Sequence, residues 1–469
     1  MTTISLQAVD FVPPRVTGSI KVRYPAHSAT EEKIKKFEEA ISRMKALPED
    51  DPRSLKKQIE LYQAYYDGNF DSVGFPDPET QVRDSWLYFP FHRMFLYFYE
   101  RILSKLCDDP SFTVPFWNWD SQQGMKLPPM YTKKSSPLYT EIQNKDKPII
   151  VLYDGNTDTD TTEETTIRDN LATMYRTMIA NGKTAELFMG RRFVTGNESV
   201  AGAGSFEMVP HRNIMVWGGC GNRWGEDMGN FYSSGRDVMF YGLHANVDRM
   251  WDVWNKTLSH RNFDDEEWLG AAFYLYDENK TLVKVKVSDF VDTEKLGYTY
   301  QTSEIPWVSA RPIRSTGLQY GEDKTTVTNI TTSDFPMVVS EVVTHTVWRP
   351  KKSRSKEERE KEEEVIVIEG IEIDPEQYVK FDVYVNEKEG KFGGPTCAEF
   401  AGSFVNVPYK MKKGVETNKK KTCLKLGLSD MLEDLGAEDD ESVHVILVPS
   451  SGDKRIRIGG VGIAYLQVK

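Results

Sequence analysis

Three of the seven histidines of the chain lie in aromatic surroundings, and they are the residues best suited to chemistry. His92 lies in "YFPFHRMFLYFYE", His211 begins "HRNIMVW", and His244 lies in "FYGLHANVDRMW". Met215 follows His211 by four residues, which places both side chains on one face of a helix. Imidazoles bind metal ions or transfer protons, and a thioether is a soft metal ligand. Two interpretations stay open at this point: a shared site, or separate buried histidines that only form hydrogen bonds.

The composition bounds the classes of partner. A chain of 469 residues is longer than one ordinary core supports, so two or more domains are expected. A net charge of −12 and a pI near 5.3 argue against nucleic acid as a partner. No stretch approaches the roughly 18–20 apolar residues that a membrane span needs. The sequence predicts neither a nucleic-acid nor a membrane partner, and it does not indicate an oligomeric state.

Helices are predicted by apolar residues at helical spacing. The predicted segments are 29–47, 53–66, 89–106 and 240–258. Thr30 is a suitable N-cap for the first of them. Residues 120–200 are rich in Asp, Thr, Asn, Gly and Pro, which predicts long surface loops.

After about residue 265 the pattern changes to alternating apolar and polar residues rich in β-branched side chains, which predicts strands of an antiparallel β domain. The segments are "KTLVKVKVSDF", "FPMVVSEVVTHTVW", "EVIVIEGIEI", "KFDVYVNE", "SVHVILVPSS" and "GGVGIAYLQVK". The charged run at 349–364 is expected to be an exposed loop inside this domain. The fold class is therefore predicted to be α+β, with a mainly α first half.

Five segments together resemble plant polyphenol oxidase, the family of catechol oxidase and tyrosinase. They are "FPFHRMFLYFYERIL", "VPFWNWD", "NRWGEDMGNFYSSGRD", "HANVDRMWDVW" and "KFDVYVNE". The resemblance runs from about residue 20 to the C-terminus, with the motifs in the family's order and spacing. It implies a four-helix-bundle core of the tyrosinase type that holds two copper ions, each bound by three histidines. Such a centre oxidises phenols or catechols to quinones.

The first copper position of the family is poorly matched. Its three histidines fall on Tyr62, Arg83 and His92, and the cysteine that forms a thioether to the second ligand falls on Tyr66. A guanidinium is permanently protonated and has no free lone pair, so Arg83 would repel a cation rather than bind it. The resemblance therefore implies that this chain has lost the coupled two-copper centre.

The second copper position is better matched. His211 and His244 are kept as the first and third ligands, and Met215 stands in place of the second. These three residues are a candidate site for one copper ion, most readily as Cu(I). Glu207 corresponds to the glutamate that orders a water molecule in the family, and Leu243 stands where a histidine often precedes the third ligand.

The replacements at the first position are polar and reactive, which favours a new chemistry over simple decay. The expected catalytic residues are His211, His92, His244, Tyr62, Arg83 and Glu207, and the expected substrate-pocket residues are Tyr66, Met215, Leu243, Phe240 and Arg212. The histidines would be bases or orienting groups, Tyr62 an acid, and Arg83 an anchor for an anion. The alternative for Arg83 is a purely structural ion pair with Asp84, Glu207 or another carboxylate.

Three functions follow from this site. The favoured one is a copper-independent enzyme of plant specialised metabolism that acts on a phenolic or alkaloid-like molecule by acid–base chemistry, without ordinary catechol oxidase activity and without a cofactor. The second is an altered phenol oxidoreductase with one copper at His211, Met215 and His244. The third is a protein that binds phenolics without catalysis.

The resemblance also bears on location and domains. The family is usually sent to the plastid and carries two N-terminal disulfides, whereas "QAVDFVPPRVTG" aligns with the cysteine-bearing region and has no cysteine. We therefore expect a cytoplasmic protein. The expected parts are a tyrosinase-like core at 1–265, a connecting segment that packs on it at 266–320, and a β-rich shielding domain at 321–469.

Overall fold

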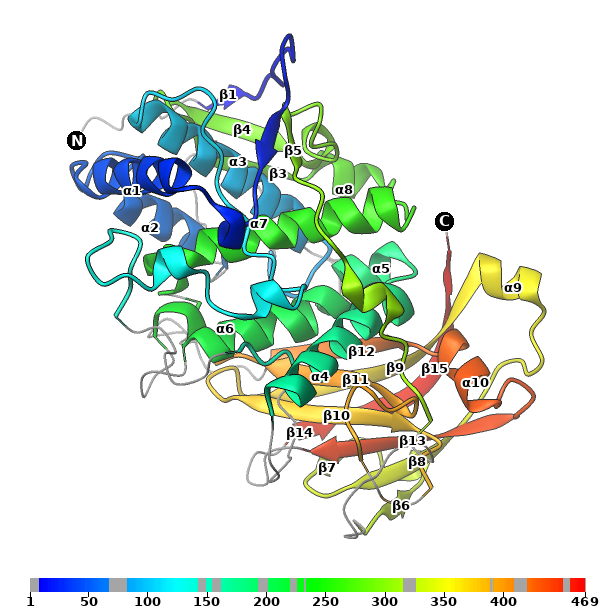
Figure 1. Cartoon of the computed structure of the whole chain (residues 1–469). Helices are drawn as coiled ribbons and strands as arrows, with labels where there is room; N and C mark the ends of the chain where they lie inside the picture. The colour runs from blue at the N-terminus through cyan, green and yellow to red at the C-terminus, as the bar shows by residue number, and fades with distance from the viewer. Residues whose placement is uncertain are drawn as a thin grey trace, which may run out of the picture.

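The computed structural model contains a helical core and a C-terminal β domain that pack side by side (Figure 1). This α+β arrangement confirms the predicted fold class. The structure describes residues 8–66, 82–141, 149–153, 162–192, 201–219, 226–231, 233–314, 326–388, 390, 392–408, 420–449 and 456–468.

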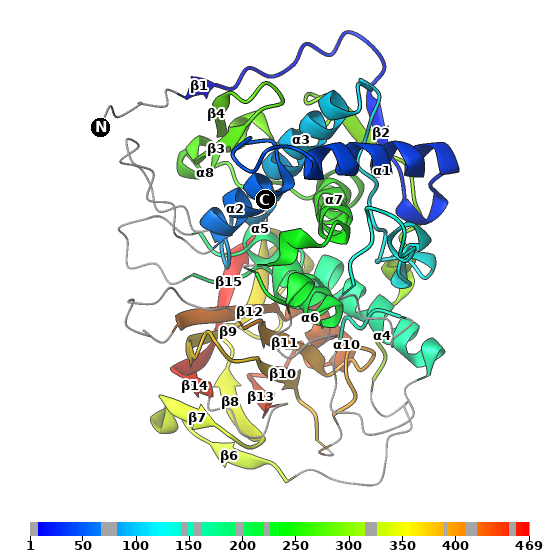
Figure 2. The ribbon, with the colours of Figure 1, turned by 90° about the vertical axis from the view of Figure 1, so that its left-hand side faces the viewer.

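The predicted helices of the core are present with small changes at their ends. They are α1 (Glu31–Lys45), α2 (Leu55–Tyr66), α3 (Tyr88–Leu106) and α7 (Met239–Asp252), to which the structure adds the shorter α5 (Ala185–Met189), α6 (Arg212–Gly218) and α8 (Glu266–Gly270). The Thr30 hydroxyl accepts a hydrogen bond from the Lys33 amide, so the predicted N-cap of α1 is confirmed. Figure 2 shows α1 crossing the outside of the core, with α7 running through its middle.

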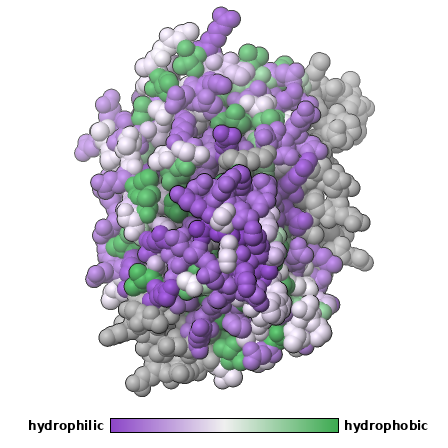
Figure 3. Space-filling model, turned by 90° about the vertical axis from the view of Figure 1, so that its right-hand side faces the viewer, coloured by the Kyte–Doolittle hydropathy of each residue, from purple (hydrophilic) through white to green (hydrophobic). Residues whose placement is uncertain are grey.

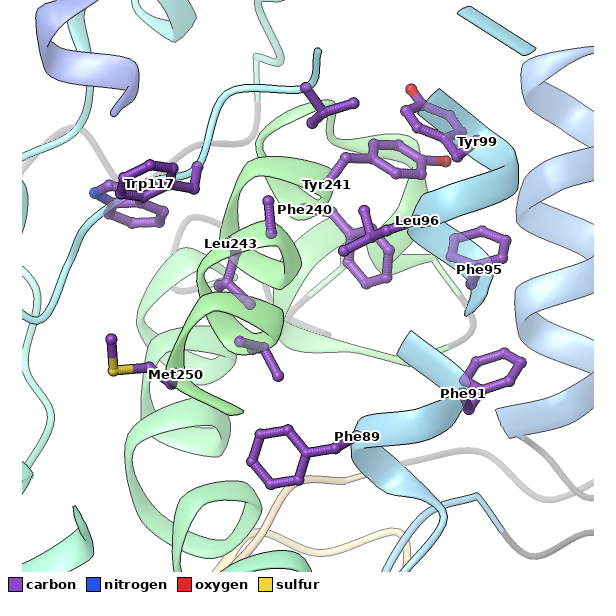
Figure 4. Packing of buried hydrophobic residues seen from close by; sticks show 14 of the residues in the cluster. Phe89, Phe91, Phe95, Leu96, Tyr99, Trp117, Phe240, Tyr241, Leu243 and Met250 are labelled. Atoms are coloured by element: carbon purple, nitrogen blue, oxygen red, sulfur yellow. The ribbon is translucent and has the colours of Figure 1, made fainter. Parts of the chain in front are cut away.

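The helices α3 and α7 form the centre of the core and pack against each other. Almost every residue of α3 is buried, which explains why its sequence is aromatic on all sides. Figure 4 shows Tyr241 of α7 lying beside Tyr99 of α3, and the two rings stack with centroids 3.8 Å apart. Aromatic packing of this kind fixes the spacing of the two helices that carry His92 and His244.

A buried ion cluster around Asp248 ties the two central helices to the rest of the core. Its carboxylate pairs with Arg93 of α3 and with Arg23, and it accepts hydrogen bonds from the hydroxyls of Tyr298 and Tyr300. The two guanidinium groups hold the pKa of the Asp248 carboxyl below its usual value, although burial alone would raise it. A buried charge is tolerated here because it is paired several times over.

Two small sheets lie on the core. In one, β1 (Val9–Asp10) pairs with β4 (Leu282–Lys286), which pairs with β3 (Ala272–Tyr276); in the other, β2 (Lys21–Arg23) pairs with β5 (Tyr298–Tyr300). The strand expected within 280–290 therefore belongs to the core and not to the C-terminal domain. Its buried residues Val283 and Val285 join the same apolar cluster as α3 and α7.

The C-terminal domain is a sandwich of two five-stranded sheets whose inner faces share one apolar cluster. One sheet has the order β11 (Phe400–Asn406), β10 (Val379–Val385), β13 (Ser442–Pro449), β8 (Val343–Trp348), β6 (Thr328–Ile330). The other has the order β12 (Lys420–Gly427), β9 (Glu362–Ile373), β14 (Ile456–Ile458), β7 (Met337–Val339), and β15 (Gly460–Gln467) also pairs with β9. The pairing is antiparallel as expected, except that β6 and β8 run parallel.

Two segments differ from the expectation. Residues 120–200, expected to be surface loops, contain α4 (Glu163–Tyr175), which continues as a π-helical turn over Arg176–Ala180 with mostly buried side chains. The charged run at 349–364 contains the short helix α9 (Lys356–Lys361), whose capping box at Ser355 and Glu358 satisfies its first amides. The helix itself is largely exposed as expected, on a face that is mostly hydrophilic (Figure 3). The two ends of the run differ from the expectation, because Arg349, Arg354, Glu363 and Glu364 are buried and Arg349 pairs with Glu364.

Within the described ranges, no helix is long and apolar enough to cross a bilayer. Cys107, Cys397 and Cys423 are buried free thiols, and Cys220 lies outside the described residues. The boundaries predicted at 1–265, 266–320 and 321–469 stay a prediction.

Replacing Asp248 by Asn should lower the free energy of unfolding by about 3–5 kcal/mol, because two buried guanidinium groups would lose their shared counter-charge. The matched control is Asp252→Asn on the same helix, which breaks a half-exposed pair with Lys256 but keeps an amide oxygen to accept from the Thr293 hydroxyl, and should cost less than about 1 kcal/mol. Urea unfolding of the wild type and both variants at pH 7 measures the difference. Equal losses in the two variants would contradict the role given to the buried cluster.

Candidate active site

Three histidines meet at the centre of the core, as the sequence predicts. The Nε2 atoms of His211 and His244 lie 3.1 Å apart. The rings of His92 and His244 stack with centroids 4.4 Å apart and an interplanar angle of 15°. All three side chains are fully buried. They come from α3, from the end of a π-helical turn at Glu207–His211, and from α7.

The hydrogen bonds of the three rings define where each can accept a proton. The Nδ1 atoms of His92 and His244 lie 2.7 and 2.8 Å from the carbonyl oxygens of Tyr88 and Phe240, so each must carry its proton on Nδ1. The Nε2 of His244 is then an acceptor, and His211 donates to it from its own Nε2. Two lone pairs are left without a hydrogen-bond partner among the described residues: Nε2 of His92 and Nδ1 of His211.

Burial keeps the three imidazoles neutral. Loss of hydration lowers the pKa of His92 to about 3, against a small opposing effect of the Tyr88 carbonyl. It lowers the pKa values of His211 and His244 well below the usual range, and the neighbouring imidazoles lower them further. Neutral rings with free lone pairs can accept hydrogen bonds or bind a cation, but the lowered pKa makes each of them a weak base.

Tyrosine rings fill the space beside the histidines. Tyr62 and Tyr66 stack on each other with centroids 4.8 Å apart, and Tyr62 lies 5.9 Å from His92 and 4.8 Å from Phe240. The ring of Phe240 lies on the inner side of α7 (Figure 4). Its centroid is 4.1 Å from that of the His244 ring. Burial raises the pKa of both tyrosine hydroxyls well above the usual value, so they are present as neutral phenols.

Arg83 stands at the edge of this cluster. Its Nε lies 3.5 Å from the carboxylate of Asp84, and its guanidinium lies 5.4 Å from the ring centre of Phe231. The structural pair with Asp84, left open by the sequence, is therefore present. The positive charge of Arg83 also acts on Tyr66, whose pKa it lowers, although burial outweighs this effect. Arg83 can stabilise an anion at the Tyr66 side of the site.

Glu207 and Arg212 form a second ion cluster behind the histidines. Both carboxylate oxygens of Glu207 accept the amide of Asp84, at 3.0 and 3.1 Å. Arg212 donates to the Asp84 carboxylate at 2.5 Å and to the Val405 carbonyl in β11 at 2.6 Å. Glu207 is therefore tied to the backbone before α3, and Arg212 joins the core to the C-terminal domain.

The remaining predicted residues, Met215 and Leu243, are both fully buried in the core cluster. The structure brings His92, His211, His244, Tyr62, Tyr66 and Phe240 into ring contact, and it places Arg83, Glu207 and Arg212 in the two ion pairs beside them. The catalytic and substrate roles of all these residues stay predictions.

Two features of the site were not predicted from the sequence: the contacts of Tyr88 and the backbone conformation of Asp84. Tyr88 packs on His92 with centroids 4.6 Å apart and on His211 at 5.2 Å, and its hydroxyl is buried. Its position four residues before His92 on one helix could have predicted this contact from the sequence. Asp84 adopts a φ of 58°, which brings its carboxylate between Arg83 and Arg212. No sequence pattern indicates that conformation.

The residues present do not fit two copper ions. At the first position, one imidazole stands with a phenol and a permanently protonated guanidinium, and the three cannot hold a cation. Among the described residues, no group of three or more His, Cys, Asp or Glu side chains is arranged to hold a metal ion. The pair His211–His244 does fit one ion, because two nitrogens 3.1 Å apart subtend about 100° at metal–nitrogen bonds of about 2.0–2.1 Å.

Three known protein families match consecutive parts of the chain. The common central domain of tyrosinase matches residues 53–257, the polyphenol oxidase middle domain 262–313, and the chloroplastic polyphenol oxidase C-terminal domain 335–465. The chain belongs to the plant polyphenol oxidase family. The tyrosinase family normally binds two copper ions.

Full-length relatives agree with this assignment. The chain is 45% identical over 480 residues to a chloroplastic polyphenol oxidase of Malus domestica, covering 98% of this chain and 80% of the relative. It is 42% identical over 468 residues to the chloroplastic (+)-larreatricin hydroxylase of Larrea tridentata, covering 98% and 80%. The solved structure of latent apple tyrosinase superposes with a TM-score of 0.90 at 44% identity, covering 98% of this chain and all of that one.

The relatives correct one expectation. The relatives from Malus domestica and Larrea tridentata are both named as chloroplastic proteins. The same holds for polyphenol oxidases of Prunus armeniaca, Ipomoea batatas and Vitis vinifera. The predicted cytoplasmic location is therefore wrong. The prediction rested on the first residues of the chain and on the missing cysteines, and neither of these reports where a protein is sent.

Replacing His92 by Gln should weaken the pH dependence of stability between pH 7 and pH 5. The buried imidazole stays neutral, whereas the unfolded one takes up a proton below about pH 6.5, so the wild type loses stability as the pH falls through this range. At pH 5 the contribution of His92 to this loss should be about 2 kcal/mol. Urea unfolding at both pH values measures it, and an unchanged pH dependence in the variant would contradict a neutral buried ring.

Proposed function

We propose that this chain is a polyphenol-oxidase homologue that has lost the two-copper centre and acts on a phenolic or alkaloid-like small molecule by acid–base chemistry. One observation carries the proposal: a permanently protonated arginine and two stacked tyrosines lie beside three neutral histidines, where the family resemblance predicts the first copper position. A relative named (+)-larreatricin hydroxylase supports the use of this fold in specialised metabolism.

The histidines supply the proton acceptors. Nε2 of His92 and Nδ1 of His211 are the two atoms with an unused lone pair, and they lie on rings whose centroids are 6.3 Å apart. A substrate hydroxyl placed between them can donate a hydrogen bond to either ring, and the phenolate that develops would raise the pKa of that imidazole so that it takes the proton. His244 accepts the hydrogen bond that fixes the tautomer of His211, so it orients the base without taking the proton.

The polar residues beside the histidines stabilise the charge that results. Removing a proton from a phenol leaves an anion, which the guanidinium of Arg83 attracts from the Tyr66 side. The neutral hydroxyls of Tyr62 and Tyr66 donate hydrogen bonds to an anion and can return a proton to it. Glu207 is held away from this role, because both its oxygens accept the Asp84 amide.

Access to the site requires movement, because its side chains are buried. Strand β11 of the C-terminal domain docks on the turn that carries His211, through Arg212 to the Val405 carbonyl and through the Val405 amide to the Met208 sulfur. Val407, just after β11, packs within the core cluster. We infer that the C-terminal domain shields the site until β11 moves or is removed.

An altered oxidoreductase with one metal ion is the second candidate, because the Nε2 atoms of His211 and His244 are spaced to share an ion. Copper would supply oxidative chemistry there, held by these two histidines with Met215 as the third candidate ligand. The Nδ1–H group of His244 already donates a hydrogen bond to the Phe240 carbonyl, as the second ring nitrogen of a metal-binding histidine usually does.

Copper content and oxygen uptake test the loss of the centre. Protein produced with excess copper should contain fewer than two ions per chain and should consume no oxygen with catechol. The triple variant Tyr62→His, Arg83→His, Met215→His should bind more copper than the wild type, since it restores an imidazole at each position. Two ions per chain with oxygen uptake in the wild type would overturn the proposal, and one ion would favour the second candidate.

Anaerobic turnover separates the functions. Phenols that bind in a calorimetric screen are incubated with and without oxygen, and the products are analysed by mass spectrometry. Acid–base turnover should be the same without oxygen, and His211→Ala should lower it by about 10²–10⁴-fold because a general base is removed. Turnover that needs oxygen would indicate the oxidoreductase, and binding without turnover in wild type would indicate a phenolic-binding protein.

A further inference from the structure

One buried arginine lacks the counter-charge that the other buried arginines have. The described residues contain eight arginines with buried side chains. Seven of them have a carboxylate oxygen within 4.0 Å, as Arg93 has in Asp248 and Arg249 has in Asp120. Arg176 is the eighth, and no carboxylate of the described residues lies that close to it. Because buried charges are normally paired, Arg176 indicates an anion that the described part of the chain does not supply.

The hydrogen bonds of Arg176 leave part of its guanidinium unused. The residue begins the π-helical turn at the end of α4, and its side chain is only 4% exposed. One terminal nitrogen donates to the carbonyls of Cys397 and Ala398, just before β11, at 2.6 and 3.2 Å. Nε is buried and has no hydrogen-bond partner among the described residues. The two carbonyls accept hydrogen bonds but bring no net negative charge, so they do not replace a counter-ion.

The pKa of Arg176 reflects the missing charge. Burial lowers it to about 10, and the carboxylates of Asp434 and Glu399 are too weakly coupled to offset the loss of hydration. Burial acts in the same direction on Arg23 and Arg212, but their paired carboxylates outweigh it and the pKa is raised. Arg176 is still protonated at pH 7, so a buried positive charge persists there without compensation.

The Arg176 side chain lines a cavity at the junction of the helical core and the C-terminal domain. The core supplies the end of α4, and the C-terminal domain supplies β11 and β12; Figure 1 shows α4 beside these strands. The cavity holds about 20 Å³, and a site needs about 10–15 Å³ to hold one water molecule. It therefore accepts a particle of about one heavy atom and excludes organic molecules.

The lining favours an ion over a water molecule. A water molecule would accept a hydrogen bond from Nε but would leave the charge of Arg176 uncompensated, whereas a halide ion, which is only slightly larger, does both. The other cation of the lining, Lys425, already pairs with Glu186 at 2.5 Å. Much of the remaining lining is apolar, including Phe400 and Leu424. One uncompensated positive charge in such a lining matches one negative charge.

We propose that the junction cavity binds one monatomic anion, a halide such as chloride, as the counter-ion of Arg176. The ion accepts a hydrogen bond from Nε and lies between the end of α4 and strands β11 and β12. Because both parts of the chain line the cavity, the ion stabilises their docked arrangement by mass action. The proposal does not depend on the chemistry at the histidines.

Thermal unfolding of the full chain in sodium chloride and in sodium gluconate, at equal ionic strength, tests the site. Gluconate is too large for the cavity, so the midpoint should be about 2 °C higher when chloride is in tenfold excess over its Kd. Arg176→Met should abolish this difference between the two salts. Lys425→Met is the matched control, because it removes the paired cation of the same lining and should keep the difference.

A second variant keeps the test decisive if Arg176→Met does not fold. Thr173 lines the same cavity, three residues before Arg176 on α4. Thr173→Asp supplies a carboxylate at helical spacing, so it should fold and show no difference between the salts.

Crystals soaked in bromide should give one anomalous scattering peak beside Nε of Arg176. Four results would each overturn the proposal. They are equal midpoints of the wild type in the two salts, a chloride effect that persists in Arg176→Met or Thr173→Asp, loss of the effect in Lys425→Met, and the absence of a bromide peak at Arg176. A bromide peak without a chloride effect in solution would show an adventitious ion only.

Discussion

The ion cluster of Glu207, Asp84 and Arg212 is the constraint on which the site depends. Three segments far apart in the sequence meet there: the loop before α3, the turn that carries His211, and strand β11 of the C-terminal domain. Because all three side chains are buried, none of these charges could be removed without leaving another uncompensated. The cluster therefore fixes Arg83, which neighbours Asp84, relative to His211 and fixes the shielding domain relative to both.

Burial keeps the three histidines neutral. Glu207, in the same turn as His211, is engaged by the Asp84 amide and by Arg212. Tyr62 and Tyr66 pack stacked rings instead of charges beside the histidines, which keeps the local dielectric low. Nε2 of His92 and Nδ1 of His211 therefore keep a lone pair that accepts no hydrogen bond from the described residues. Arg83 is the cation proposed to stabilise a negative charge that forms beside them.

Much of the fold was open to prediction because it is set by local periodicity. The aromatic run of α3, the amphipathic α1 with its cap at Thr30, and the alternating strands β9, β10, β13 and β15 all match their segments. The helix α4 was missed because its sequence is rich in polar residues, and its burial comes from tertiary packing. The strand β4 matches a predicted strand, and it packs on the core, within the segment 266–320 that was expected to pack there.

The site was predicted to the level of residues but not of contacts. Convergence of the three histidines and the tyrosines followed from the family resemblance. The direct His211–His244 hydrogen bond, the capture of Glu207 by an amide, and the positive φ of Asp84 did not, because each depends on backbone geometry that no spacing encodes. Tyr88 is the exception, since its spacing from His92 was visible in the sequence.

A π-helical turn links the histidine site to the C-terminal domain. The turn covers Glu207–His211, and its last residue is a member of the histidine cluster. It presents His211 to the central site, where its Nε2 lies 3.1 Å from Nε2 of His244, and it presents the Met208 sulfur to β11, where it accepts from the Val405 amide. Movement of β11 would therefore act on the same turn that holds His211. The C-terminal domain and the histidine cluster are connected through a single element of backbone.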